Sequence, residues 1–341
     1  MKAVYFEGHG GPEVLKFGSV KDPVVSKNDV LIGVKACALN HLDIWIRQGA
    51  LSIPLPMPHI LGADVSGVVL DFGKSVKGFK KGQRVVVSPG QLAQDTKKFE
   101  GRDSYSPDFK ILGLQTQGGY AEKLAVDSRF VIPVSDRYSF EEWASFPLTA
   151  VTAYHMLVTR SCLKRGETVL VHAAGSGIGS LAIQLAKYLG ATVYTTVGDE
   201  KKVSRARNLG ADEVILYRTE DFSQKIKKLT GQKGVDVIFE HIGPEAWQKN
   251  LSCLARGGRM VTCGATSGPK AEMDIRTLYS KQMSILGSYM GSLSELKKAL
   301  KLAEKGLLKP TLDQIFPLAE ATAAHRRMES RQNFGKIVLK I

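Results

Sequence analysis

The second half of the chain alternates between short β-branched runs and helical segments, and this alternation constrains the fold more than any other feature. The β-branched runs are "TVLVHA", "TVYTTV", "EVIL", "VDVIFEHI" and "RMVTCGA", which begin at residues 168, 192, 213, 235 and 259. Such an alternation predicts a parallel sheet with helices on both faces. The intervening helical segments end near glycines suited to a left-handed cap, namely Gly190, Gly210, Gly231 and Gly257.

The part of the chain before about Val151 follows a different pattern. Apolar alternations separated by Gly, Pro and Asp, such as "DVLIGVKACAL", "ADVSGVVLDFG" and "GQRVVVSPG", predict strands joined by tight turns. The C-terminal end returns to a helix, "ATAAHRRMESRQ", and a last strand, "GKIVLKI". A length of 341 residues favours two domains, one β-rich and one α/β.

Residues 168–186 contain no charged side chain and approach the length of a membrane span. Their Gly-Ser-Gly centre divides them into a strand, a loop and a helix, so we expect no membrane segment there. The loop, "HAAGSGIGSLA", is suited to a dinucleotide pyrophosphate, because glycines let the backbone approach it and a helix N-terminus stabilises its charge. The candidate cofactor-binding residues are Ala174, Gly175, Ser176, Gly177, Ile178 and Gly179. Ala174, Gly177 and Gly179 occupy the three fingerprint positions, and Gly175 is additional.

The end of the second α/β strand predicts NADP rather than NAD. An NAD-binding enzyme usually has an acid there, which accepts hydrogen bonds from the adenosine ribose. This sequence has Val197 followed by Gly198, which leaves room for a 2′-phosphate, and Lys201 and Lys202 begin the next helix close enough to pair with it. Asp199 and Glu200 are interpreted as helix N-terminal acids.

Lys and Arg outnumber Asp and Glu by 47 to 33, which gives a net charge of +14. The basic residues are scattered pairs, so this charge favours solvated helix ends and attraction of an anionic ligand over nucleic-acid binding. Four cysteines without a CxxC pair suit a reducing compartment, and the N-terminus lacks the apolar segment of a signal peptide. We therefore expect a cytoplasmic protein.

The segments "ALNHLDIWIRQG", "PLTAVTAYHML", "HAAGSGIG" and "ILGSYMG" resemble the medium-chain dehydrogenase/reductase superfamily, most closely its zinc-independent quinone oxidoreductase-like and alcohol dehydrogenase-like branch. The resemblance extends over the whole chain. It implies a GroES-like catalytic domain at residues 1–147, completed by residues 293–341. It also implies a Rossmann domain with a doubly wound sheet at residues 148–292, and a homodimer or homotetramer joined through "MSILGSYM".

Zinc-dependent members of this superfamily hold a catalytic metal with Cys, His and a further Cys or Asp. The corresponding positions here are Asn40, Ala63 and Leu148. Ala and Leu cannot bind a metal, and an amide oxygen alone is a poor zinc ligand. The four Cys positions of the structural zinc lobe correspond to Ala93, Thr96, Phe99 and Ser106. We expect no metal. A substitute site built from His41, Asp43, His59 and Asp64 is the alternative.

The resemblance also implies site residues. The implied catalytic residues are Asn40, Asp43 and Trp45; Asp43 can equally support the fold, and Trp45 can equally be an apolar wall. The implied cofactor contacts are His41 near the pyrophosphate, Thr152 at the nicotinamide, Gly264, Ala265, Thr266, Ser288, Tyr289 and Met290 beside it, and Tyr217 and Arg331 near the 2′-phosphate. Thr152 has an alternative as a helix residue bonded to its own backbone. Arg331 has one as a surface helix cap.

The sequence therefore predicts an NADP(H)-dependent oxidoreductase that acts on a small hydrophobic carbonyl or quinone. Without a metal, fixed hydrogen-bond donors must stabilise the charge on the substrate oxygen. Quinones and conjugated enones spread this charge, so they need less stabilisation than simple ketones. The alternatives are an alcohol dehydrogenase-type ketone reductase and a non-enzymatic NADPH- or nucleic-acid-binding protein.

Overall fold

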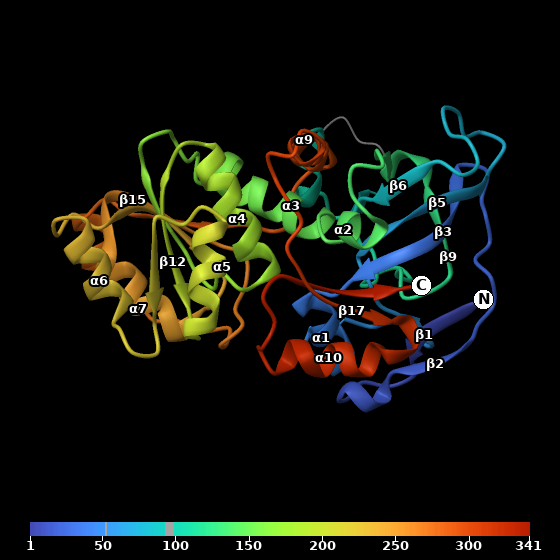
Figure 1. Ribbon diagram of the computed structural model, residues 1–341, viewed down its shortest axis with the longest axis horizontal. Helices are drawn as coiled ribbons and strands as arrows, with labels where there is room; N and C mark the ends of the chain where they lie inside the picture. Colours follow the sequence, from blue (N-terminus) through green and yellow to red (C-terminus); the bar gives the residue numbers. More distant parts are fainter. Residues whose placement is uncertain (52, 93–98) are drawn as a thin grey trace. The chain divides into compact units, whose positions relative to one another are not determined.

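The computed structural model describes residues 1–51, 53–92 and 99–341. Its packing separates two units (Figure 1). Unit 1 comprises Met1–Val151, Ser292–Gly306 and Pro310–Ile341, and unit 2 comprises Thr152–Gly291 and Leu307–Lys309. The chain thus leaves unit 1 and returns to it.

Unit 2 is built on a six-stranded parallel sheet. Its strands are β11 (Thr168–Val171), β12 (Thr192–Val197), β13 (Glu213–Leu216), β14 (Val235–Glu240), β15 (Leu254–Thr262) and β16 (Ser284–Gly287). They lie in the order β13-β12-β11-β14-β15-β16, and every neighbouring pair is parallel. Numbered along the chain, this is the 3-2-1-4-5-6 order of a doubly wound dinucleotide-binding sheet. The predicted α/β fold class is confirmed.

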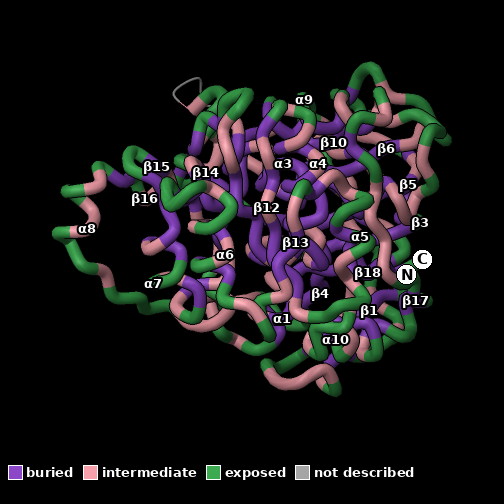
Figure 2. Tube along the Cα trace, turned by 60° about the vertical axis from the view of Figure 1, so that its left-hand side comes forward, coloured by how far each residue is buried: buried purple, intermediate pink, exposed green. Residues whose placement is uncertain are grey.

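Helices cover both faces of this sheet. They are α4 (Gly177–Tyr188), α5 (Val203–Asn208), α6 (Phe222–Leu229) and α7 (Pro244–Cys253). Figure 1 shows α4 and α5 on one face and α6 and α7 on the other. The β-branched runs are buried because both of their faces meet helices, and Leu170, Ile238 and Met260 have no exposed surface. The short helix α8 (Ile275–Ser280) is mostly exposed (Figure 2).

Three of the four predicted helix caps are confirmed. Gly190, Gly210 and Gly231 follow α4, α5 and α6 with left-handed φ values of 84°, 105° and 57°. The prediction for Gly257 is wrong, because this residue lies inside β15. Helix α7 ends earlier, at Cys253, because the buried Leu254 is already extended and pairs with β14.

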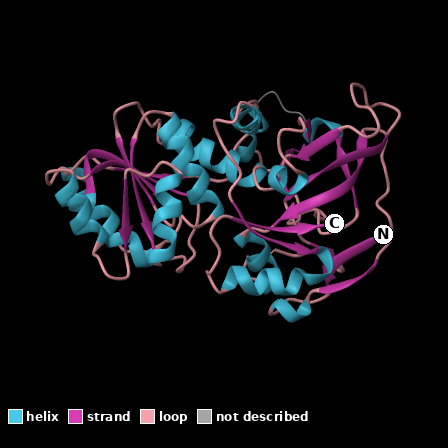
Figure 3. Ribbon diagram, in the orientation of Figure 1, coloured by secondary structure: helices cyan, strands magenta, loops and turns pink. Residues whose placement is uncertain are grey.

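Unit 1 is rich in strands (Figure 3). Its largest sheet has the order β10-β6-β5-β3-β18-β17, and β9 also pairs with β3. These strands are β3 (Asp29–Ala38), β5 (Asp64–Phe72), β6 (Arg84–Val87), β9 (Lys123–Asp127), β10 (Val131–Pro133), β17 (Leu312–Pro317) and β18 (Lys336–Lys340). Smaller sheets contain β1 (Lys2–Phe6), β2 (Lys16–Ser19) and β4 (His59–Ile60), and β7 (Gly90–Leu92) and β8 (Phe109–Ile111).

The register of the last strand matters for the site. Strand β18 pairs antiparallel with β3, and Val338 lies opposite Ala38. Ala38 also lies opposite Asp64, the first residue of β5. The C-terminal strand is therefore inserted beside the start of the chain, and its first residue, Lys336, comes close to the segment after β3.

The helices near unit 1 are α1 (His41–Gln48), α2 (Phe140–Ala144), α3 (Pro147–Tyr154), α9 (Leu293–Glu304) and α10 (Ala321–Glu329). Of these, α10 was predicted. Helix α3 continues as a π-helical segment, His155–Arg160. Short 3₁₀ turns occur at Pro12–Val14, Asp103–Tyr105, Ser128–Phe130, Glu200–Lys202 and Leu318–Glu320.

Residues 168–186 form β11, the glycine-rich loop and most of α4. Among the residues that the structure describes, no helix is both long and apolar enough to cross a bilayer.

Candidate functional site

The glycine-rich loop lies between β11 and α4 in unit 2. The Ser176 hydroxyl caps α4 by accepting a hydrogen bond from the Gly179 N–H at 2.9 Å. The Ala174 N–H donates to the Thr196 carbonyl at 3.0 Å, which ties the loop to β12. A Cβ on Gly179 would lie 2.3 Å from the Ala173 carbonyl oxygen, so only glycine fits there. The loop, with Gly175, Gly177 and Ile178 at its turn into the helix, has the geometry of a dinucleotide loop.

The end of β12 brings two predicted cofactor residues together. Val197 is the last residue of β12 and is buried. A Cβ on the next residue, Gly198, would lie 2.8 Å from the Tyr217 hydroxyl, so Tyr217 packs over this glycine. Asp199 accepts from the Lys201 N–H at 2.9 Å, as expected for a helix N-terminal acid. Lys202 ends the 3₁₀ turn one residue later.

Glu240, at the end of β14, is a positioning residue that the sequence analysis missed. Its fully buried carboxylate accepts from the N–H groups of Ile242 (2.6 Å) and Gly243 (2.7 Å). Its second oxygen accepts from the Thr262 hydroxyl at 2.6 Å, at the end of β15. The Ser288 N–H in turn donates to the Thr262 carbonyl at 2.8 Å. Glu240 therefore joins the loops that follow two neighbouring strands.

The predicted nicotinamide segments lie on this same edge of the sheet, because parallel strands all end there. Gly264, Ala265 and Thr266 follow β15, and the Thr266 hydroxyl donates to the His241 carbonyl at 3.0 Å. The other segment, Ser288, Tyr289 and Met290, follows β16. In a doubly wound sheet, ligands bind at the carboxyl ends of the strands.

Two hydroxyls at predicted cofactor positions have no hydrogen-bond partner among the described residues. They are Thr152 Oγ1 and Ser288 Oγ, and both atoms are buried. Thr149, on the same helix as Thr152, bonds back to the carbonyls of Ser145 (2.9 Å) and Phe146 (3.0 Å). Thr152 makes no such bond, so the interpretation that its hydroxyl bonds to its own helix is wrong. Buried hydroxyls are normally paired, which makes these two candidates for a ligand contact.

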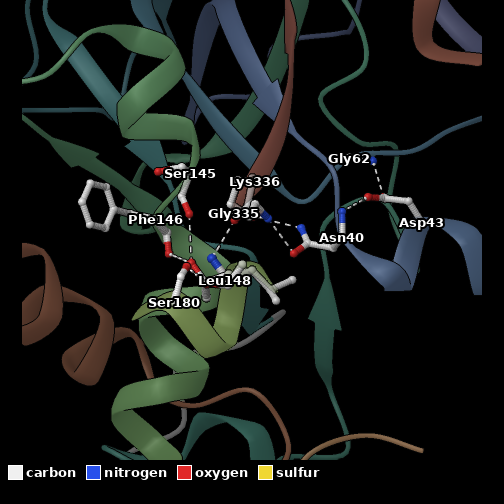
Figure 4. A network of polar contacts seen from close by, with 12 residues as sticks. Asn40, Asp43, Gly62, Ser145, Phe146, Leu148, Ser180, Gly335 and Lys336 are labelled. Atoms are coloured by element: carbon white, nitrogen blue, oxygen red, sulfur yellow. Dashed lines mark hydrogen bonds and ion pairs between the residues drawn. The ribbon is translucent and has the colours of Figure 1, made fainter. Parts of the chain in front are cut away.

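In unit 1, Asn40 lies at the N-cap of α1. Its N–H donates to the Asp43 carboxylate at 2.7 Å, and the Gly62 N–H donates to the other Asp43 oxygen at 3.1 Å (Figure 4). Asp43 thus holds the turn that carries Asn40, as expected for a residue that supports the fold. Asn40 and Asp43 form the capping box of this helix.

The Asn40 amide is also part of a buried charged cluster with Asp64 and Lys336. The Lys336 ammonium donates to Asn40 Oδ1 at 2.8 Å and to Asp64 Oδ2 at 2.7 Å, and Asn40 Nδ2 donates to Asp64 Oδ2 at 2.9 Å. The Leu148 N–H donates to Asp64 Oδ1 at 2.6 Å. Figure 4 shows Lys336, Asn40 and Leu148 converging. We call Asn40, Asp64 and Lys336 the amide cluster; Lys336 was not among the predicted site residues.

A chain of buried polar groups continues from Asp43. The Tyr120 hydroxyl lies 3.3 Å from Asp43 Oδ2 and 3.4 Å from His325 Nε2, and His325 Nδ1 lies 3.1 Å from the Arg47 guanidinium. Arg47 also pairs with Glu329. Burial raises the pKa of Asp43 to about 6. Burial and the Arg47 charge lower the pKa of His325 to about 3, so this imidazole is neutral at pH 7.

His41, Trp45, His59 and Arg331 are further predicted residues that belong to unit 1. His41 and Trp45 are one turn apart on α1, with ring centroids separated by 6.3 Å. His59 Nε2 lies 3.0 Å from the Gly113 carbonyl, and burial lowers its pKa. Arg331 follows α10 with a left-handed φ of 57°, as a helix-capping residue does.

The residue types that bind metals are not gathered in this fold. Across residues 1–51, 53–92 and 99–341, no group of three or more His, Cys, Asp or Glu could hold a metal ion. Ala93 and Thr96, two positions of the resembled structural zinc lobe, lie outside the described residues.

A doubly wound sheet with a glycine-rich loop defines an α/β dinucleotide-binding type of protein, joined here to a β-rich unit. Comparisons with known proteins agree. Residues 26–136 match the alcohol dehydrogenase GroES-like domain, and residues 177–305 match the family described as zinc-binding dehydrogenase. The chain therefore belongs to the medium-chain dehydrogenase/reductase superfamily, whose members are oxidoreductases that bind a nicotinamide cofactor.

Individual relatives cover nearly all of the chain. The quinone oxidoreductase of Homo sapiens is 32% identical over 347 residues, which span 99% of this chain and 97% of the relative. Quinone oxidoreductase 1 of Escherichia coli (strain K12) is 33% identical over 348 residues and covers 98% of each chain. A crystal structure of an NAD-dependent alcohol dehydrogenase is 40% identical, with a TM-score of 0.96 over 100% of both chains.

Proposed function

We propose that this protein is an NADPH-dependent reductase that transfers hydride to a quinone, a conjugated enone or an activated hydrophobic ketone without a catalytic zinc ion. The observation that carries this proposal is the Lys336 ammonium, which is bonded to the Asn40 and Asp64 oxygens. Ala63 and Leu148 offer no side-chain ligand atoms, and a zinc ion at Asn40 would face a positive charge. The residues present do not fit a zinc ion.

The residues do fit a nicotinamide dinucleotide, which supplies the hydride when bound. The glycine-rich loop and the α4 N-terminus would hold the pyrophosphate, with His41 as a further candidate contact. The unpartnered hydroxyls of Thr152 and Ser288 would position the nicotinamide, together with the segments 264–266 and 288–290. A buried hydroxyl without a partner is unfavourable, and a ligand amide would relieve this cost.

The preference for NADPH rests on the end of β12. Val197 and Gly198 present no carboxylate to repel a 2′-phosphate, and the nearby candidates for contacting it are Lys202 and Tyr217. Arg331 is a further candidate. One similar solved structure is described as an NAD-dependent enzyme, so cofactor choice is the part of the proposal that most needs a measurement.

Reduction without a metal requires hydrogen-bond donors for the substrate oxygen. The Asn40 amide is the candidate donor, and the Trp45 indole is a second donor or an apolar wall. Such donors are most effective when they are fixed before the reaction. Quinones and enones delocalise the negative charge that arrives with the hydride, which is why they are the proposed substrates. The names of the two quinone oxidoreductase relatives agree with this choice.

An alcohol dehydrogenase-type ketone reductase acting on bulky substrates is the second candidate, favoured by the alcohol dehydrogenase crystal structure. We further propose a cytoplasmic homodimer or homotetramer joined through the edge strand β16, with no nucleic-acid or membrane partner. The catalytic domain would comprise residues 1–147 and 293–341, and the Rossmann domain residues 148–292.

Cofactor choice is tested with Lys202→Ala, and Lys201→Ala measures separately what the adjacent lysine contributes. A charge-assisted hydrogen bond contributes about 1.5–3 kcal/mol, or roughly 10–150-fold in affinity. Lys202→Ala should weaken NADPH binding by that factor and leave NADH nearly unchanged, at one fixed salt concentration. A wild type that prefers NADH, or a variant that weakens both cofactors equally, contradicts the assignment.

The reaction is tested by following NADPH oxidation with quinones, enones and cyclic ketones, together with metal analysis of the purified protein. We expect turnover of quinones or enones that survives chelation, with far less than one zinc per chain. One zinc per chain and loss of activity on chelation would support the alcohol dehydrogenase alternative.

A further inference from the structure

The three positions that hold zinc in the resembled metal-dependent enzymes are joined here by one carboxylate. Asp64 directly follows Ala63, and its fully buried side chain accepts hydrogen bonds from Asn40 Nδ2 (2.9 Å) and the Leu148 N–H (2.6 Å). A buried carboxylate needs a compensating charge. That charge is Lys336, which is only 5% exposed and lies 2.7 Å from Asp64. The cation at this position is therefore an ammonium group of the chain itself.

This arrangement fixes the orientation of the Asn40 amide. An ammonium only donates hydrogen bonds, and a carboxylate only accepts them. Asn40 Oδ1 must therefore face Lys336, and Asn40 Nδ2 must face Asp64, as observed (Figure 4). The reverse orientation would place the amide NH₂ against the ammonium and the amide oxygen against the carboxylate. Charge chemistry alone selects one of the two amide orientations.

The local sequence offered the Asn40 side chain another role. Asn at a helix N-cap normally accepts a hydrogen bond from the first turn of the helix. Asn40 and Asp43 have the spacing of a reciprocal capping pair. The Asp43 carboxylate accepts from the Asn40 N–H, and the Asn40 amide is also bonded to Lys336 and Asp64. The amide at the start of α1 is thus held in a fixed orientation by groups from two distant segments.

We propose that Lys336 is a positioning residue that orients and polarises Asn40 so that the second Asn40 Nδ2–H donates to the substrate oxygen. This inference rests on the proposed hydride transfer to a carbonyl or quinone. Within the described part of the chain, Asn40 Nδ2 donates only to Asp64, so one of its two N–H groups is available. A positive charge bonded to Oδ1 draws electron density from the amide and strengthens the N–H as a donor. Lys336 acts through Asn40 and does not itself touch the substrate.

The test compares Lys336→Met, Asn40→Ala and the double variant in the full-length protein. The readouts are the single-turnover rate of NADPH oxidation with a quinone or enone that the wild type reduces, and the NADPH dissociation constant. Removal of one fixed donor to a developing oxyanion lowers kcat by roughly 10²–10³-fold. We expect that loss in Asn40→Ala, a loss of at least tenfold in Lys336→Met, and no further loss in the double variant. NADPH affinity should change less than twofold.

The matched control is Arg327→Met, which breaks the Arg327–Asp313 ion pair of unit 1 and touches no residue of the amide cluster. Its kcat should stay within twofold of the wild type. If Lys336→Met does not fold, Lys336→Met/Asp64→Asn replaces it, because this neutral pair leaves no uncompensated buried charge. The Asn40 amide is then still free to flip between its two orientations. That variant should be folded and slow.

The outcomes separate the two proposals. A wild type that reduces no quinone, enone or ketone overturns the proposed function and, with it, the role of Lys336. An active wild type with a folded Lys336 variant at unchanged kcat overturns only the positioning role. Independent, multiplying losses in the double variant overturn it as well, because Lys336 would then not act through Asn40.

Discussion

Breaking the buried ion pair between Lys336 and Asp64 should destabilise unit 1. The hydrogen bonds around the pair predict which of the two variants, Lys336→Met or Asp64→Asn, loses more stability. In Lys336→Met, Asp64 keeps its bonds from Asn40 and Leu148, but its charge has no partner. In Asp64→Asn, the introduced amide would face three donors, from Lys336, Asn40 and Leu148, so its NH₂ must oppose one of them. Asp64→Asn should therefore be the more damaging change.

The magnitude follows from the burial of both charges, because Lys336 is 5% exposed and Asp64 is not exposed at all. Removing one partner of a buried pair costs about 3–5 kcal/mol. We expect about 3 kcal/mol for Lys336→Met and about 5 kcal/mol for Asp64→Asn. For a unit of this size, 1 kcal/mol shifts Tm by roughly 2–4 °C, so the losses are about 6–12 °C and 10–20 °C.

The double variant Lys336→Met/Asp64→Asn should recover part of this loss. The amide introduced at position 64 can accept a hydrogen bond from the Leu148 N–H. It can also donate to Asn40 Oδ1 once the Asn40 amide has flipped to its other orientation. Calorimetry of the wild type, both single variants and the double variant gives the coupling free energy, which should be at least 2 kcal/mol. Single variants that each lose less than 1 kcal/mol, or a double variant less stable than both, would refute this reasoning.

Three further predictions concern other parts of the molecule. Gly179→Ala should abolish NADPH binding measured by fluorescence titration, because the added Cβ would lie 2.3 Å from the Ala173 carbonyl oxygen and distort the glycine-rich loop. Retained affinity would mean that the loop accommodates the Cβ or that the pyrophosphate binds elsewhere. Thr152→Val should keep or raise Tm and weaken NADPH binding by about tenfold, as expected for one lost hydrogen bond. Thr149→Val, whose hydroxyl bonds to its own helix, should leave NADPH affinity unchanged. Equal NADPH affinities of the two variants would contradict a hydrogen bond between Thr152 and the cofactor. Acid should destabilise the protein through His325, because burial lowers the pKa of this imidazole from its ordinary 6.5 to about 3. Between these pH values the unfolded chain binds a proton that the folded chain does not bind, so stability falls as the pH drops. Burial raises the pKa of Asp43 to about 6, so the folded chain takes up a proton at Asp43 between about pH 6 and 4, which offsets the loss of stability caused by His325. The urea midpoint of unfolding should therefore fall most steeply below pH 4, and it should fall less in His325→Gln. Parallel pH profiles of the wild type and His325→Gln would exclude His325 as the cause.

The sequence by itself determined most of unit 2. Strand and helix periodicities are local properties of the chain, so the runs that became β11 to β15 and the glycine-rich loop were readable without contacts. The end of β12 at Val197 was likewise predicted. The failure at Gly257 has a tertiary cause, because pairing of Leu254 with β14 ends α7 before that glycine.

Helix α1 was also readable in principle, because Asn40 and Asp43 have the spacing of a helix-starting pair. The sequence did not reveal the distant partner of the Asn40 side chain. Its amide oxygen accepts from Lys336, and no local pattern indicates this contact.

Only the tertiary structure decided what stands at the position that holds zinc in the resembled metal-dependent enzymes. Asn40 and Lys336 are 296 residues apart, and Lys336 is one of many lysines in a chain with 47 basic residues. The register that places Val338 opposite Ala38 brings the two together. Sequence reasoning could remove the metal ligands by residue type, because each is a property of one side chain. It could not supply the replacing charge, because a buried ion pair exists only once the strands that carry its partners have paired.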